Sequence, residues 1–107
     1  MPSVAKMKKT VETKSHRTTV LVVDDNSIFR KTVLKFLETQ FNSMNLIEAN
    51  NGSDAMQLVQ ENVPDLIVLD INMANMSGIE VAQQVKQEFP FIPIIILTNY
   101  DENEYRL

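Results

Sequence analysis

The sequence contains no cysteine, which excludes disulfide bonds, thiolate metal sites and a cysteine nucleophile. This absence fits a reducing compartment, and we expect the protein to be cytoplasmic. Long apolar runs are also lacking: stretches such as residues 66–69 and 94–97 are far too short to span a bilayer, so we expect no membrane contact. The N-terminal lysines are followed by no apolar segment, which argues against a secretory signal.

The net charge of −4 is divided unevenly along the chain. Residues 1–19 carry five basic residues and one acidic residue, whereas residues 20–107 carry five basic and thirteen acidic residues. A basic tail on an acidic body can contact nucleic acid or an acidic partner. Because this tail has no aromatic residue and no clear periodicity, we interpret residues 1–18 as a solvated, disordered leader. The remaining residues, 19–107, have the length of one small domain.

Apolar runs and helical patterns alternate through the rest of the chain. Runs at residues 20–23, 46–49, 65–69 and 94–97 predict strands, of which the first and the fourth are expected to be buried. Helices are predicted over residues 28–41, 54–62 and 78–89, with Ser27 and Ser53 as the N-caps of the first two. Residues 71–77 are expected to form a loop, and residues 101–107 the first turns of another helix. Such alternation predicts a parallel sheet with helices on both faces.

Helical spacing indicates which side chains of the predicted helices face the core. The expected inward residues are Phe29, Val33, Phe36, Leu37 and Phe41 in the first helix, Ala55, Leu58 and Val59 in the second, and Ile79, Ala82, Val85 and Phe89 in the third. Charged residues fill the other side of the first helix, namely Arg30, Lys31, Lys35 and Glu38.

Polar residues follow three of the predicted strands. Asp24 and Asp25 follow the first strand, Asp70 the third, and Thr98 the fourth. Ligands of such sheets bind outside the carboxyl ends of the strands, so these side chains are expected to converge. Three neighbouring carboxylates require compensation by a raised pKa, a lysine or a metal ion. Oxygen ligands with spare positions suit Mg²⁺, and a carboxylate can attack phosphorus to give an aspartyl phosphate.

Four stretches in order resemble the receiver domains of bacterial two-component response regulators. They are residues 20–25 (VLVVDD), 49–55 (ANNGSDA), 65–70 (DLIVLD, followed by NM and, at 76–78, MSG) and 94–98 (IIILT). The resemblance covers the chain from about residue 19 to its end. It implies an α/β fold with a flavodoxin-like, doubly wound parallel sheet in the order 2-1-3-4.

The resemblance also implies a role for each matching residue. Asp70 matches the phosphoacceptor, Asp25 the acid that binds Mg²⁺ directly, and Asp24 the acid that acts through water. Asn72 stands where the family offers a backbone carbonyl to the metal, and Thr98 matches the hydroxyl that turns toward the phosphoryl group. The implied cofactor is Mg²⁺, and the implied partner is a histidine kinase or a phosphotransfer protein. Beyond slow self-dephosphorylation, no enzymatic activity is implied.

The sequence also departs from the family pattern. Ala74 replaces a common proline, Asn99 replaces a small residue, and no residue matches the family's lysine, which lies on a fifth strand beyond Leu107. We therefore expect an incomplete domain that lacks its fifth strand and last helix. Its fourth strand would form an exposed edge, which favours a homodimer or a completing partner. On its own the chain is expected to be only marginally stable.

Two alternatives to a phosphorylated receiver stay open. The chain could be a non-phosphorylated receiver that serves only as a protein interaction or dimerisation module. A Mg²⁺-dependent phosphotransferase with an aspartyl nucleophile is disfavoured, because such enzymes place a second acid two residues after the nucleophile, where this chain has Asn72. No direct binding of nucleic acid is expected.

Overall fold

The computed structural model describes residues 17–73 and 77–97, in which strands and helices alternate as predicted. The elements are β1 (Thr19–Val23), α2 (Ser27–Gln40), β2 (Asn45–Ala49), α3 (Gly52–Asn62), β3 (Leu66–Asp70), α4 (Gly78–Glu88) and β4 (Ile94–Leu97). The helix predicted over residues 101–107 and most of the predicted leader lie outside the described residues. Among the residues that are described, no helix is long and apolar enough to cross a membrane.

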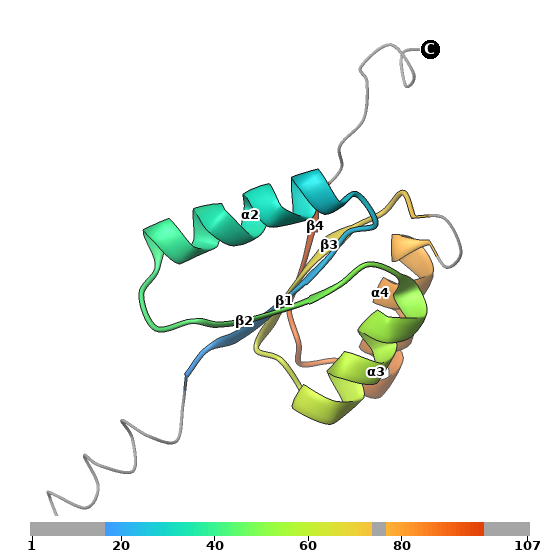
Figure 1. Ribbon diagram of the computed structural model, residues 1–107. Coiled ribbons are helices and arrows are strands. Elements are labelled where there is room, and N and C mark those ends of the chain that lie inside the picture. The colour runs from blue at the N-terminus through green and yellow to red at the C-terminus, as the bar shows by residue number, and fades with distance from the viewer. Residues whose placement is uncertain (1–16, 74–76, 98–107) are drawn as a thin grey trace, which may run out of the picture.

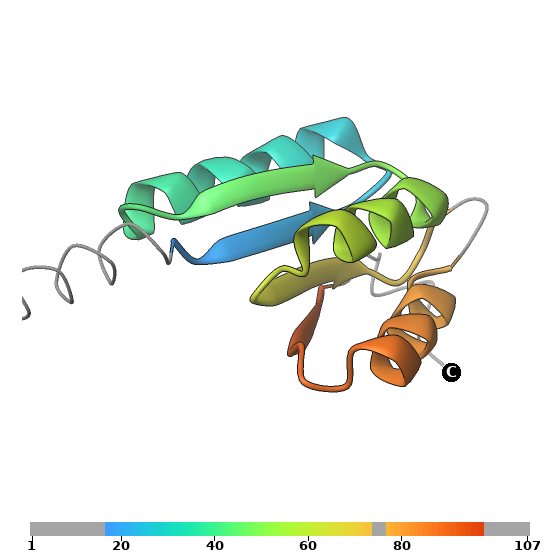
Figure 2. The same cartoon turned by 90° about the horizontal axis from the view of Figure 1, so that it is seen from below.

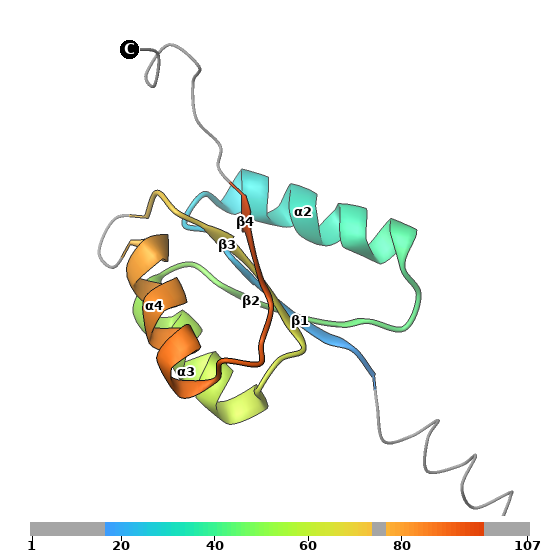
Figure 3. The same cartoon turned by 180° about the vertical axis from the view of Figure 1, so that it is seen from behind.

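The four strands form one parallel sheet in the order β2-β1-β3-β4. Figure 2 shows the strands side by side in this order. Helix α2 covers one face of the sheet, and α3 and α4 cover the other, as Figures 1 and 3 show from opposite sides. This is the predicted flavodoxin-like, doubly wound arrangement. Its central strand, β1, is hydrogen-bonded on both edges, so its polar end lies inside the sheet and not at its margin.

Strand β1 is apolar at successive positions because both of its faces are buried. Leu21 and Val23 belong to the core under α3 and α4, whereas Val20 and Val22 pack under α2. All four side chains are at most 1% exposed. The buried members of the larger core are Leu21, Val23, Ala49, Ala55, Met56, Val59, Ile67, Leu69, Val81, Val85 and Ile92.

Helix α2 contacts the sheet through a different set of side chains from the predicted one. Val33 and Leu37 contact the sheet as expected, together with Leu34, which was not predicted. Phe36 is 58% exposed, because it lies roughly 100° around the helix from the packing direction of these three residues. Phe41 is 48% exposed, since it follows the helix as an extended C-cap and no longer obeys helical spacing.

The inward faces of α3 and α4 were predicted in part. Ala55, Val59 and Val85 are fully buried as expected, while Leu58, Ala82 and Phe89 pack against this core from partly buried positions. Ile79 was wrongly assigned to the core and is 54% exposed, because Val81 occupies the inward position of that turn of α4. Met56 is a further core residue that the pattern missed.

The two predicted N-caps were also wrong, because both helices begin earlier than their serines suggest. Asn26 caps α2, accepting a hydrogen bond from the Phe29 N–H at 3.0 Å, and Asn51 caps α3 in the same way through Asp54. Asparagine and serine are equally suited to this position.

Strand β4 lies at an edge of the described sheet, paired with β3. This edge position was predicted, but the expected burial of the strand was wrong: Ile95 and Ile96 are 48% and 44% exposed, because β4 pairs with β3 alone within the described residues. The predicted consequences for assembly and stability stay predictions.

Gly78, the first residue of α4, touches the backbone of Asp70. A β-carbon at this position would lie 2.1 Å from the Asp70 carbonyl oxygen and 2.6 Å from the α-carbon of Ile71. The Gly78 N–H also donates to the Ile71 carbonyl at 3.1 Å. The start of α4 therefore sits directly against the end of β3, and only glycine fits between them.

We expect Gly78→Ala to lower the free energy of unfolding by about 1–3 kcal/mol, because the added methyl group must push α4 away from β3. The amide resonance of Asn72 should shift as well, since this N–H donates to Asp70 Oδ1. Urea unfolding and ¹H–¹⁵N spectra measure the two effects. Gln83→Ala, an exposed substitution on the same helix, serves as the control, and equal behaviour of the two variants would contradict the prediction.

Candidate metal centre

Asp24, Asp25 and Asp70 come together at the carboxyl edge of the sheet, as the sequence predicted. One carboxylate oxygen of each lies within 4.8 Å of those of the other two. The parallel register pairs Val23 with Leu69, so the residues that follow them, Asp24 and Asp70, emerge side by side. Asp24 and Asp70 are 3% and 6% exposed, whereas Asp25 is open to solvent.

Backbone amides two residues further along hold both buried carboxyl groups. The Asn26 N–H donates to Asp24 Oδ1 at 2.9 Å, and the Asn72 N–H donates to Asp70 Oδ1 at 3.2 Å. The main chain of Asp24 is fixed as well, because its N–H donates to the Ala49 carbonyl at 3.1 Å. The two acids thus have defined orientations before any ligand binds.

Burial and like charge perturb both of these acids. Burial is the largest cause that raises the pKa of Asp24, and the charges of Asp70 and Asp25 raise it further against the opposing hydrogen bond from Asn26. Burial also raises the pKa of Asp70, together with the charge of Asp25. Hydrogen bonds from the backbone amides of Asn72 and Ile71 act against this increase at Asp70.

The donor set of this cluster fits a hard divalent cation. Its oxygens are carboxylates, two of them buried and mutually repulsive, and a cation between them would remove the cause of that repulsion. Mg²⁺ binds through one or two carboxylates and keeps several waters, for which the exposed side of Asp25 leaves room. Within residues 17–73 and 77–97 this is the one such group of three or more potential ligands.

Two other predicted site residues cannot be placed in the same way. Thr98 lies outside the described residues, as do Ala74 and Asn99. Asn72 is described and exposed, and its N–H faces Asp70, but the role predicted for its carbonyl group stays a prediction.

Arg30 is a residue of the site that the sequence pattern missed. It was assigned to the solvent side of its helix, yet its side chain is only 12% exposed. Its Nη1 donates to the Asp24 carbonyl at 2.7 Å, and its Nε donates to Glu48 Oε1 at 2.7 Å. The pairing of β1 with β2 could have revealed this role, because it places Glu48 beside Val22 and within reach of α2.

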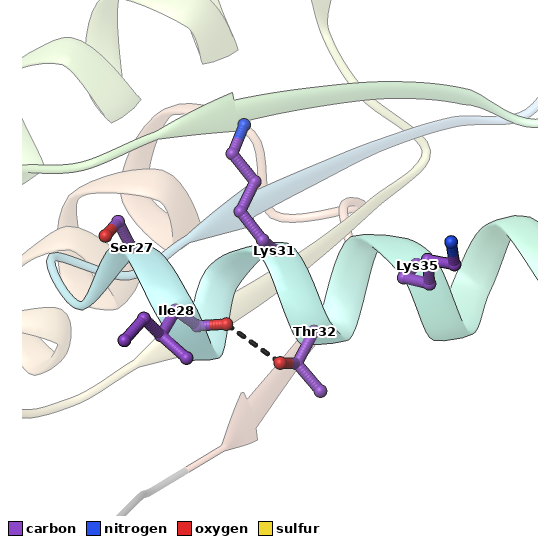
Figure 4. Close-up of a pocket in the computed structure, with 5 residues that line it drawn as sticks. All are labelled: Ser27, Ile28, Lys31, Thr32 and Lys35. Atoms are coloured by element: carbon purple, nitrogen blue, oxygen red, sulfur yellow. Dashed lines mark hydrogen bonds between the residues drawn. The ribbon is translucent and has the colours of Figure 1, made fainter.

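A shallow hollow of about 560 Å³ lies on the outer side of α2. Figure 4 shows its lining residues, Ser27, Ile28, Lys31, Thr32 and Lys35. Ile28 is 80% exposed and stands three residues after Asp25, and Thr32 Oγ1 donates to its carbonyl at 2.8 Å. The start of this helix thus presents an exposed apolar side chain that is close in the sequence to the acids Asp24 and Asp25.

Comparison with known proteins finds the same family in sequence and in structure. A family model described as the response regulator receiver domain matches residues 20–107. The response regulator protein VraR of Staphylococcus saprophyticus is 38% identical over 84 residues, which are 78% of this chain and 40% of that protein. The transcriptional regulatory protein YdfI of Bacillus subtilis is 40% identical over 84 residues, which are 78% of this chain and 39% of that protein.

A solved structure agrees with these relatives. The chemotaxis protein CheY4 of Vibrio cholerae superposes with a TM-score of 0.72 at 30% identity, over 83% of this chain and 74% of that chain. The chain spans about two fifths of the length of the curated relatives it matches. Fold, acid cluster and matched residues therefore agree that the chain belongs to the response regulator receiver domain family.

Proposed function

We propose that the chain accepts a phosphoryl group on Asp70 in a two-component phosphorelay. The observation that carries this proposal is the juxtaposition of Asp70 with Asp24 and Asp25 at the end of the central strands. Asp70 offers a carboxylate oxygen that can attack phosphorus, and the two neighbouring acids supply oxygen ligands for Mg²⁺. Bound Mg²⁺ would neutralise charge on the phosphoryl group during transfer.

The proposed donor is a phosphohistidine. An Asp70 oxygen bonds to phosphorus while the bond from phosphorus to the imidazole nitrogen breaks, and that nitrogen leaves with the electron pair and takes up a proton. Asp70 must be ionised to attack, and a bound cation would favour this form by offsetting the burial and the charge of Asp25 that raise its pKa. Release follows when water attacks the acyl phosphate, and this slow loss is the only catalysis we propose.

Two further residues are proposed to act on the bound groups. Thr98 would donate its hydroxyl to a phosphoryl oxygen, and the Asn72 carbonyl would bind the metal. Phosphorylation adds charge and acceptor oxygens, which shift a conformational equilibrium that already exists. We propose a cytoplasmic location, since the donor and acceptor must meet in one compartment.

The first prediction concerns the acceptor itself. With Mg²⁺ and acetyl phosphate, the 107-residue chain should gain one phosphoryl group, detected by intact-protein mass spectrometry and removed by hydroxylamine. Asp70→Asn should abolish the adduct, because an amide oxygen is a poor nucleophile. Asp54→Asn, which changes an exposed acid of α3, should leave it unchanged.

Absence of an adduct from a folded sample, as judged by circular dichroism, would sink the proposal. It would favour the alternative in which the chain is a non-phosphorylated interaction module, with a second copy or another partner at the β4 edge.

A second prediction concerns pH and Mg²⁺. The folded pKa values of Asp24 and Asp70 lie above their unfolded values, so the folded chain binds more protons between those limits. The free energy of unfolding should therefore fall as pH rises through this window, starting near pH 4. Asp24→Asn removes one buried charge and should raise the melting temperature at pH 7 without metal.

Mg²⁺ should raise the free energy of unfolding of the natural chain by about 2.7 kcal/mol when its concentration is a hundred times its dissociation constant. The same Mg²⁺ concentration should stabilise the Asp24→Asn variant less. Thermal melts across pH, with and without Mg²⁺, measure both effects. The prediction is wrong if the variant is less stable than the natural chain at pH 7 and gains as much from Mg²⁺.

We further propose that the protein donor contacts the start of α2. A donor histidine must approach Asp70 from the carboxyl edge of the sheet, and α2 begins two residues after Asp25. Ile28, which lines the hollow in Figure 4 and lies three residues after Asp25, offers an exposed apolar contact beside this approach.

Ile28→Ala should slow phosphotransfer from a histidine phosphotransfer protein while leaving phosphorylation by acetyl phosphate unchanged. The reason is that the small donor needs no docking surface. Phe91→Ala is the matched control, because Phe91 is 70% exposed but lies just before β4, at the amino edge of the sheet. Equal rates for Ile28→Ala and Phe91→Ala with the protein donor would refute this contact.

A further inference from the structure

Asp24 is held through its peptide groups by two neighbouring elements. Its N–H donates to the Ala49 carbonyl at the end of β2, and its carbonyl accepts from Arg30 Nη1 at 2.7 Å. Arg30 reaches this carbonyl from the second turn of α2, and its Nε is bound at the same time to Glu48, which precedes Ala49. Arg30 and Glu48 thus connect α2, β2 and the end of β1.

The hydrogen bonds around this turn form a closed ring that links Arg30, Asn26 and Asp24. The Arg30 N–H donates to the Asn26 carbonyl at 2.9 Å, and the Asn26 N–H donates to Asp24 Oδ1. The side chain of Arg30 then returns to the Asp24 carbonyl. Because that carbonyl belongs to the peptide that joins Asp24 to Asp25, rotation of this peptide would move both acids.

We infer that Arg30 is a positioning residue for the acid cluster: Glu48 fixes its guanidinium group, and the guanidinium fixes the peptide between Asp24 and Asp25. This inference rests on the proposed function of the cluster as a metal and phosphoryl site. The contact of Arg30 with Asp24 is to its main-chain carbonyl, so the positioning proposed here acts through the main chain.

The charges around Arg30 favour a geometric role over an electrostatic one. Arg30 is paired with Glu48, whose pKa is lowered by its hydrogen bonds with Lys31 first and Arg30 second. The planar fork of arginine can bind a carboxylate and a carbonyl together, which a lysine ammonium cannot do in the same geometry.

Lys31 provides the matched control. Its Nζ donates to both Glu48 oxygens, at 3.1 and 2.9 Å, and its side chain is 62% exposed. Lys31→Gln therefore removes an ion pair with Glu48 and one positive charge from α2, but leaves the contact between Arg30 and Asp24 in place.

The test compares Arg30→Gln, Arg30→Lys and Lys31→Gln in the full chain. In ¹H–¹⁵N spectra recorded without metal, Arg30→Gln should shift the amide resonances of Asp25 and Asn26. In calorimetric titrations with MgCl₂, it should weaken binding about tenfold, as expected for loss of a group that orients a metal ligand. Arg30→Lys should resemble Arg30→Gln, whereas Lys31→Gln should leave both measurements unchanged.

The inference is wrong if Arg30→Gln has the same Asp25 and Asn26 amide resonances and the same Mg²⁺ affinity as the natural chain. Full recovery in Arg30→Lys would overturn it too, since charge alone would then suffice. If the natural chain binds no Mg²⁺, the proposed function fails, but the amide shifts measured without metal still decide whether Arg30 holds Asp25 and Asn26. If Arg30→Gln does not fold, Arg30→Lys, which keeps an aliphatic stem and a charge, gives the same comparison.

Discussion

Parallel pairing of β1 with β3 is the contact on which the site depends, because each strand ends in one of the two buried acids. The pairing is secured by apolar residues: Leu21, Ile67 and Leu69 are fully buried in the core under α3 and α4. A shift in register by one residue would exchange the two faces of β3 and separate Asp70 from Asp24. The apolar core therefore determines a distance between two carboxyl groups that repel each other.

The acids near this edge of the sheet have pKa values that are shifted in opposite directions. Asp24 and Asp70 are buried beside further negative charge, and their pKa values are raised. Glu48, a short way along the neighbouring strand, is paired with Arg30 and Lys31, and its pKa is lowered. Arg30 and Lys31 are thus bound to Glu48, whereas a cation from outside the chain would offset the repulsion that raises the pKa values of Asp24 and Asp70.

The sequence predicted the order of the elements and the acid cluster because both depend on strong local patterns. Runs such as residues 20–23 are apolar at every position, and an acid directly after such a run must lie at the carboxyl edge of a parallel sheet. The inward face of α2 was predicted less well, because the choice between Leu34 and Phe36 depends on how the helix lies on the sheet. Arg30 was missed for a related reason: its partners come from β1 and β2, and only their pairing brings Glu48 near.

The residues that hold Asp24 all precede Asp70 in the chain. Asp24, Arg30 and Glu48 belong to the unit of β1, α2 and β2, whose two strands pair with each other directly. These three residues therefore lie in one continuous segment of the chain, and the nucleophile comes from a separate segment. In the order of the sequence the segment that holds the acidic turn comes first, and Asp70 reaches that turn only through the pairing of β1 with β3.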